Sequence, residues 1–143
     1  MIEIRRAQVE DAERLHEIND TAFGYYYPKD KTKKRLEEIL DRKTDCILVA
    51  CKEGTVVGYV HGADYECIYS DSLKNIMAIA VEESYQGLGI GKKLLEGIEA
   101  WAKEDGCEGV RLVSGFNREK AHGFYQHCGY DLRKDQKNFI KYI

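Results

Sequence analysis

Residues 79–92 read IAVEESYQGLGIGK and pass from an apolar run through a glycine-rich loop into a segment with helical periodicity. Glycine lets a backbone turn sharply and lets a ligand approach the amides closely. The first amides of a helix have no partner within the helix, and the helix dipole is positive at that end. The stretch therefore predicts a strand, a loop and a helix that together can seat a pyrophosphate, with Lys92 adding positive charge.

Two other phosphate-binding loops do not fit this stretch. The dinucleotide fingerprint needs Gly-x-Gly-x-x-Gly, whereas the spacing here is Gly87-x-Gly89-x-Gly91. A Walker A loop needs Ser or Thr after its lysine, and Lys92 is followed by Lys93. A glycine-rich turn with a purely geometric role stays open at this point.

The chain downstream of the loop predicts two helices and three strands. Apolar residues recur at helical spacing from Lys92 to Asp105, and Gly106 can end that helix. A strand is expected at 109–113, a short helix at 120–127 closed by Gly129, and final strands at 130–133 and 139–143.

The chain upstream predicts a short first strand, two helices and three strands. The first strand is expected at 2–5, a helix from Glu10, and a second helix capped by Thr32. Residues 46–51 form a continuous apolar run, as expected for a strand covered on both faces. A tight turn at 52–55 joins it to a strand beginning at Val56, and a further strand is expected at 73–81.

The predicted order is β-α-α-β-β-β-α-β-α-β-β, which is an α/β (α+β) domain with a mixed sheet. No linker or repeat interrupts the sequence, so residues 1–143 are expected to form a single domain.

Composition excludes several classes of protein. The net charge is -3 and the pI about 5.8, which gives no electrostatic footprint for nucleic acid. No apolar run approaches the ~20 residues of a membrane span, and no secretory signal precedes the first strand. Five scattered cysteines without CxxC spacing, and four histidines without ligand spacing, predict reduced thiols and no metal site. A cytoplasmic protein is expected.

Two spaced motifs resemble those of the GNAT superfamily of N-acetyltransferases. The family signature Gln/Arg-x-x-Gly-x-Gly/Ala matches residues 86–91, and a second pattern matches Asn117, Ala121 and Tyr125. The resemblance implies the acyl-CoA N-acyltransferase fold and direct transfer of acetyl from acetyl-CoA to a primary amine. The alternatives are a non-catalytic acyl-CoA-binding sensor of the same fold and an interaction module that binds no cofactor.

The resemblance also implies roles for individual residues. The Ile79 amide would stabilise the oxyanion, and Tyr125 would protonate the departing thiolate. The cofactor would be held by two groups of residues: Ile79, Ala80, Val81, Gln86, Gly87, Leu88, Gly89, Ile90, Gly91 and Lys92, and then Asn117, Ala121, Phe124 and Tyr125.

The amine acceptor is harder to predict. Tyr26 and Tyr27 lie where the family places a substrate lip, although packing explains them equally well, and Glu66 and Asn75 are further candidates. Family members often carry a general base two or four residues before Ile79, but Met77 and Asn75 stand there, so we expect no base on this strand. The acceptor can be a small molecule or a peptide, and a homodimer is compatible with the resemblance.

Overall fold

The computed structural model describes residues 1–143, which form two compact units, Met1–Leu112 and Val113–Ile143. The first, here the N-terminal unit, contains all of the strands and three of the four α-helices. Its elements are β1 (Ile2–Arg6), η1 (Val9–Asp11), α1 (Ala12–Phe23), α2 (Lys29–Leu40), β2 (Asp45–Lys52), β3 (Thr55–Tyr65), β4 (Leu73–Val81), η2 (Glu83–Tyr85), α3 (Ile90–Glu104) and β5 (Gly109–Leu112). The C-terminal unit contains α4 (Glu119–His127).

The five strands form one sheet in the order β1-β2-β3-β4-β5. The first three pairings are antiparallel, and β5 pairs with β4 in parallel from Leu73↔Gly109 to Ile76↔Leu112. Beyond Ile76, β4 continues to Val81 with β3 as its only partner. The sheet therefore opens on one side of β4, in the half of the strand that leads into the glycine loop.

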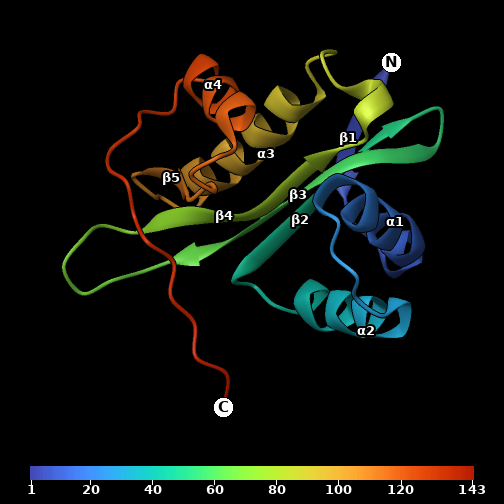
Figure 1. The fold of residues 1–143 in the computed structure, drawn as a ribbon, viewed down its shortest axis with the longest axis horizontal. Helices are drawn as coiled ribbons and strands as arrows, with labels where there is room; N and C mark the ends of the chain where they lie inside the picture. The colour runs from blue at the N-terminus through green and yellow to red at the C-terminus, as the bar shows by residue number, and fades with distance from the viewer. The chain divides into compact units, whose positions relative to one another are not determined.

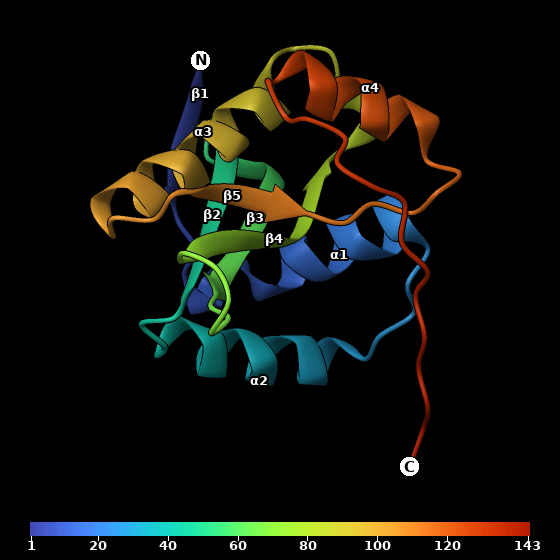
Figure 2. The same cartoon turned by 90° about the vertical axis from the view of Figure 1, so that its left-hand side faces the viewer.

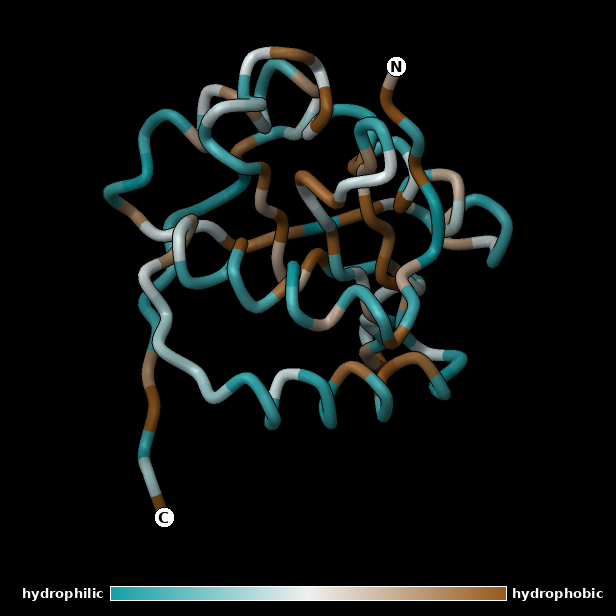
Figure 3. Tube along the Cα trace, turned by 90° about the vertical axis from the view of Figure 1, so that its right-hand side faces the viewer, coloured by the Kyte–Doolittle hydropathy of each residue, from teal (hydrophilic) through white to brown (hydrophobic).

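Helices cover both faces of this sheet, with α1 and α2 on one face and α3 on the other (Figures 1 and 2). Figure 3 shows hydrophobic (brown) stretches in the middle of the fold and also along the helix at the bottom of the view. Residues 46–51 of β2 are buried without interruption, as predicted for a strand covered on both faces. Ile47, Val49 and Cys51 belong to the core cluster that also includes Leu15 and Leu36 of α1 and α2.

A glycine lets α3 lie close to the sheet. A Cβ at Gly97 would be 2.5 Å from the Cδ1 atom of Leu48 in β2, so a side chain there requires a shift. Leu94, Leu95 and Ile98 of the same helix have no exposed surface. The glycine at this position therefore allows α3 to pack closely on β2.

The start of β4 is fixed to the end of α3 by a buried lysine. The residue Lys74 is 2% exposed, and its ammonium lies 2.6 Å from Asp64 Oδ1 and 2.7 Å from Asp105 Oδ2. It also lies 3.8 Å from the centre of the Trp101 ring. Both carboxylates and the aromatic face offset the cost of burying the charge.

The two final strands predicted at 130–133 and 139–143 are not formed. The chain after α4 has no regular secondary structure; the helix ends at His127, and Gly129, whose φ is 92°, follows two residues later. Between the two apolar pieces lies the polar run RKDQKN, residues 133–138, which interrupts any alternating pattern. Two short isolated pieces cannot form a stable ladder by themselves.

All four helix starts differ from prediction. Helix α1 begins at Ala12, after the 3-10 turn η1, and not at Glu10, and α4 begins at Glu119 and not at residue 120. Thr32 was expected to cap α2, but the helix begins at Lys29 after Pro28, and Thr32 Oγ1 donates to the Pro28 carbonyl at 3.2 Å. The ring of Pro28 fixes its φ at a value that is compatible with the start of a helix. The helix therefore begins directly after Pro28, without a side-chain cap. Helix α3 begins at Ile90, two residues before the predicted Lys92, because the turn at Gly89 leads directly into it.

Candidate functional site

The second half of β4 contains the predicted residues Ile79, Ala80 and Val81. They pair on one side with Val60, Tyr59 and Gly58 of β3 and have no strand on the other side. Backbone groups on this open edge are available to a ligand. The Val81 carbonyl already accepts one hydrogen bond, from Gln86 Nε2 at 3.1 Å. The Gln86 side chain thus fixes the glycine loop to the end of β4.

The glycine loop leaves open space beside its backbone. Gly87 and Gly89 have φ values of 81° and 80°, a left-handed conformation that favours glycine. No atom lies within 4 Å of where a Cβ would stand at either residue, and Leu88 between them is 58% exposed. The loop can therefore admit a bulky group close to its amides.

Helix α3 begins at this loop with its amides uncapped. Gly89 is the N-cap residue and no side chain caps the helix. The first amide with a helical acceptor is that of Lys93, 3.1 Å from the Gly89 carbonyl, so the amides of Ile90, Gly91 and Lys92 have none. Because the helix dipole is positive here and the Lys92 and Lys93 side chains are exposed, this end attracts an anion such as a pyrophosphate.

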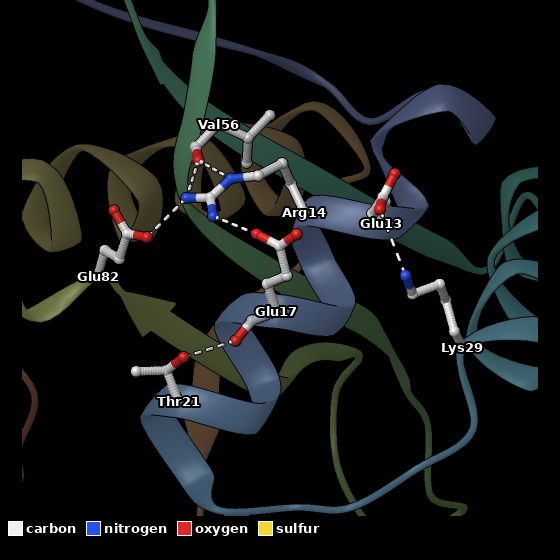
Figure 4. A network of polar contacts seen from close by, with 7 residues as sticks. All are labelled: Glu13, Arg14, Glu17, Thr21, Lys29, Val56 and Glu82. Atoms are coloured by element: carbon white, nitrogen blue, oxygen red, sulfur yellow. Dashed lines mark hydrogen bonds and ion pairs between the residues drawn. The ribbon is translucent and has the colours of Figure 1, made fainter.

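Arg14 of α1 holds the turn between β4 and the glycine loop (Figure 4). Its guanidinium donates to the Val56 carbonyl of β3 at 3.0 and 2.7 Å, to Glu82 Oε1 at 2.8 Å and to Glu17 Oε2 at 2.7 Å. Glu82 is also held through its amide, which donates to the Val57 carbonyl at 2.8 Å. Burial acts to lower the pKa of Arg14, but the hydrogen bonds that it donates to Glu82 and Glu17 raise it overall. The loop is thus anchored from the opposite face of the sheet.

Asn75 is occupied by protein groups. Its Oδ1 accepts from Arg111 Nη1 at 2.6 Å, and its Nδ2 lies 3.2 Å from the sulfur of Met77. The Arg111 guanidinium lies over the Tyr65 ring, 4.2 Å from its centre. Neither position 75 nor position 77 of this strand holds a carboxylate or a histidine that could act as a base. The structure adds that the Asn75 amide binds Arg111 and Met77.

The predicted acceptor residues lie at two separate places in the N-terminal unit. Tyr26 and Tyr27 belong to the loop between α1 and α2 and are 92% and 46% exposed. Glu66 follows β3, and its Oε2 accepts from Ser72 Oγ at 3.1 Å. Asp64, two residues before Glu66, is paired with the Lys74 ammonium.

The remaining predicted residues lie in the C-terminal unit. Asn117 precedes α4, and Ala121, Phe124 and Tyr125 lie on that helix. The Tyr125 ring contacts the rings of Phe124 and Tyr130, with centres 5.4 and 6.4 Å apart. Burial raises the pKa of Tyr125, so its hydroxyl stays protonated at neutral pH and can donate a proton.

Neither a metal cluster nor a membrane-spanning helix is present among residues 1–143. No group of three or more His, Cys, Asp or Glu side chains is placed to hold a metal ion. Every helix is too short or too polar to cross a bilayer.

Sequence reasoning did not find the residues that support the site from a distance. Arg14 binds groups 42 and 68 positions away in the chain. Tyr59, whose hydroxyl donates to Asn19 Oδ1, was seen only as part of a strand. For both residues, the only hint in the sequence is a polar or charged side chain within an otherwise apolar pattern.

The chain is similar to known proteins over most of its length. The model of the Acetyltransferase (GNAT) family matches residues 12–130. The aminoglycoside N(6')-acetyltransferase type 1 of Stenotrophomonas maltophilia is 25% identical over 138 residues, which cover 90% of this chain and 85% of that protein. The protein YjhQ of Escherichia coli, named an uncharacterized N-acetyltransferase, is 31% identical over 123 residues, covering 83% of this chain and 67% of its own.

A solved structure shares the fold. AAC(6')-Iy in complex with the bisubstrate analog CoA-S-monomethyl-acetylneamine has a TM-score of 0.87 and 18% identity, covering 100% of this chain and 99% of that one. At this identity the similarity concerns the fold.

Proposed function

The chain belongs to the GNAT family of acetyltransferases, and on this basis we propose that it transfers acetyl from acetyl-CoA to a primary amine of a small molecule. The observation that carries the proposal is the uncapped start of α3 behind Gly87 and Gly89, next to the open edge of β4. The family match extends across both units, which supports a single functional domain over residues 1–143.

The residues present fit acetyl-CoA. Free space at Gly87 and Gly89 matches the close approach that a pyrophosphate needs, and the amides of residues 90–92 supply donors. The open edge of β4 offers backbone groups of Ile79 and Ala80 to an extended arm. When bound, acetyl-CoA supplies an activated acetyl thioester.

In our proposal the protein contributes positioning, an oxyanion donor and a proton donor. The Ile79 amide would stabilise charge on the acetyl oxygen, and the Tyr125 hydroxyl would give its proton to the thiolate. Asn117, Ala121 and Phe124 would bind the pantetheine arm. Much of the acceleration would come from holding the amine and the thioester together.

The proposal is tested by measuring release of free CoA thiol from acetyl-CoA in the presence of a panel of primary amines. A parallel thermal-shift measurement should show stabilisation by acetyl-CoA alone, about 2.7 kcal/mol at 100 times Kd. The absence of any shift at millimolar acetyl-CoA would remove the cofactor assignment. A shift without thiol release from any amine would remove the catalytic one.

A further inference from the structure

A hollow of about 470 Å³ lies between α1 and the start of α2, within the N-terminal unit. Its volume falls within the roughly 300–1,000 Å³ of small-molecule sites. Its lining comprises His16, Asn19, Gly24, Tyr25, Tyr26, Tyr27 and Thr32. We call it the tyrosine hollow.

The lining presents aromatic rings and no carboxylate or cationic lysine or arginine. The Tyr25 ring stacks on Phe23 with centres 5.2 Å apart, and the Tyr27 carbonyl is held by His16 Nε2 at 2.7 Å. Exposed aromatic rings favour a flat apolar group, which can stack on them. A ligand with several ammonium groups would instead be favoured by several carboxylates, and the lining has none.

Asn19 links the tyrosine hollow to the second half of β4. Asn19 lines the hollow and accepts a hydrogen bond from the Tyr59 hydroxyl, and Tyr59 pairs with Ala80, the residue after Ile79. Helix α1, which carries Asn19, packs against both β3 and β4. Burial raises the pKa of Tyr59 to about 12, so this hydroxyl remains a donor throughout the physiological range.

The second hollow of the unit is smaller than the tyrosine hollow and is lined by charged side chains. It measures about 180 Å³ and is lined by Asp64, Glu66, Lys74 and Asp105 among others. Two of its three carboxylates are already paired with the Lys74 ammonium. These four charged groups sum to −2, so the hollow can attract a cation, but its volume lies below the roughly 300–1,000 Å³ of small-molecule sites.

We propose that the acceptor is a monoamine bearing one aromatic or flat apolar group, which binds in the tyrosine hollow, and not a polycation of the aminoglycoside kind. This inference rests on the proposed acetyl transfer. In that step the amine nitrogen forms a bond to the acetyl carbon as the carbon–sulfur bond breaks. The amine proton passes to water, and the departing thiolate takes up a proton.

The test compares kcat/KM for 2-phenylethylamine, n-butylamine and neamine, measured by release of CoA thiol from acetyl-CoA with the full chain. The aromatic amine should exceed each of the others by about tenfold, since ring contacts of this kind are worth that order of discrimination. n-Butylamine separates ring contacts from simple attraction of an ammonium. A preference for neamine would overturn the inference and leave acetyl transfer intact.

A matched pair of variants locates the contact. Tyr26→Ala should reduce the preference for 2-phenylethylamine over n-butylamine severalfold. Tyr69→Ala, which removes another tyrosine that is 82% exposed but lies between β3 and β4, should retain it. Loss of the preference in Tyr69→Ala alone would overturn the inference, because the acceptor would then bind near residues 64–72. If no amine releases thiol and acetyl-CoA gives no thermal shift, the proposed function fails together with the inference.

Discussion

Gly54 and Gly89 have almost the same backbone angle, with φ values of 82° and 80°, and neither has an atom within 4 Å of a Cβ position. Gly54 lies in the hairpin between β2 and β3, and the chain on either side of it enters the sheet, where Lys52 pairs with Thr55. Gly89 leads into α3, where the next amides have no helical acceptor. A left-handed glycine therefore marks only a turn, and the unpaired amides that follow it make a candidate binding site.

The largest expected effect tests this comparison directly with Gly89→Val and Gly54→Val. Both place a β-branched residue in a left-handed conformation, so each should lower stability by a similar amount, about 1–2 kcal/mol. Only Gly89→Val should also weaken acetyl-CoA binding, by about 100-fold or more, because its side chain enters the space beside the amides. Thermal unfolding and calorimetric titration measure the two effects. Equal affinities in the two variants would place the cofactor elsewhere.

In this comparison backbone amides bind the cofactor, so a side chain must supply the proton for the reaction. The variant Tyr125→Phe tests whether that side chain is Tyr125. The hydroxyl is proposed to act only as the carbon–sulfur bond breaks, so kcat should fall while the Kd of acetyl-CoA changes little. A thiolate is a good leaving group, so we expect the low end of general-acid effects, about 100-fold. Steady-state kinetics with a good acceptor, beside a binding titration, provide the measurement. An unchanged kcat would exclude Tyr125 from the proton transfer.

A third change sharpens the comparison by loosening the glycine loop without altering its glycines. Arg14→Met removes the hydrogen bonds to Val56 and Glu82, and should lower stability by about 1–3 kcal/mol and weaken acetyl-CoA binding severalfold. Lys29→Met is the control, since the Lys29–Glu13 pair at 3.3 Å is 59% and 68% exposed and contributes at most about 1 kcal/mol. If both variants unfold at the same temperature, the Arg14 network does not anchor the loop.

The smallest effect is expected on the strand beside the loop, where Asn75→Ala should change kcat/KM by only about twofold. Its amide already binds Arg111 and Met77 and can at most position a water, because it cannot take up the proton of the amine. Without a base at 75 or 77, kcat/KM should rise with pH toward the pKa of the free amine, about 10.4 for an alkyl amine. A pH profile with a limb between pH 6 and 7 that one carboxylate or histidine substitution removes would show that the enzyme does possess a base.

Local patterns explain why the central elements could be predicted. The bounds of β4 agree with the prediction, and the buried run of β2 and the periodicity of α3 were read correctly, because each depends on neighbouring residues. The glycine spacing of residues 87–91 placed the loop for the same reason.

Long-range contacts explain what could not be predicted. The partners of Arg14 and Lys74 lie on other elements, and no local pattern names them. Nor does the sequence show that β5 stops pairing at Ile76, which opens the edge of β4. At the other end of the chain, apolar pieces at 130–133 and 139–143 suggested strands, but a strand also needs a neighbour to pair with, and the structure gives them none.

The burial of Lys74 has a consequence for chemical labelling of this protein. Asp64, Asp105 and the Trp101 ring surround its ammonium. Burial acts to lower the pKa of Lys74, but hydrogen bonds to the two aspartates raise it overall, so the uncharged, nucleophilic form is scarce. Amine-reactive reagents, and acetyl-CoA itself, should therefore spare this lysine while the chain is folded. Its peptide would then serve as an internal gauge of intact tertiary structure in a mass spectrum.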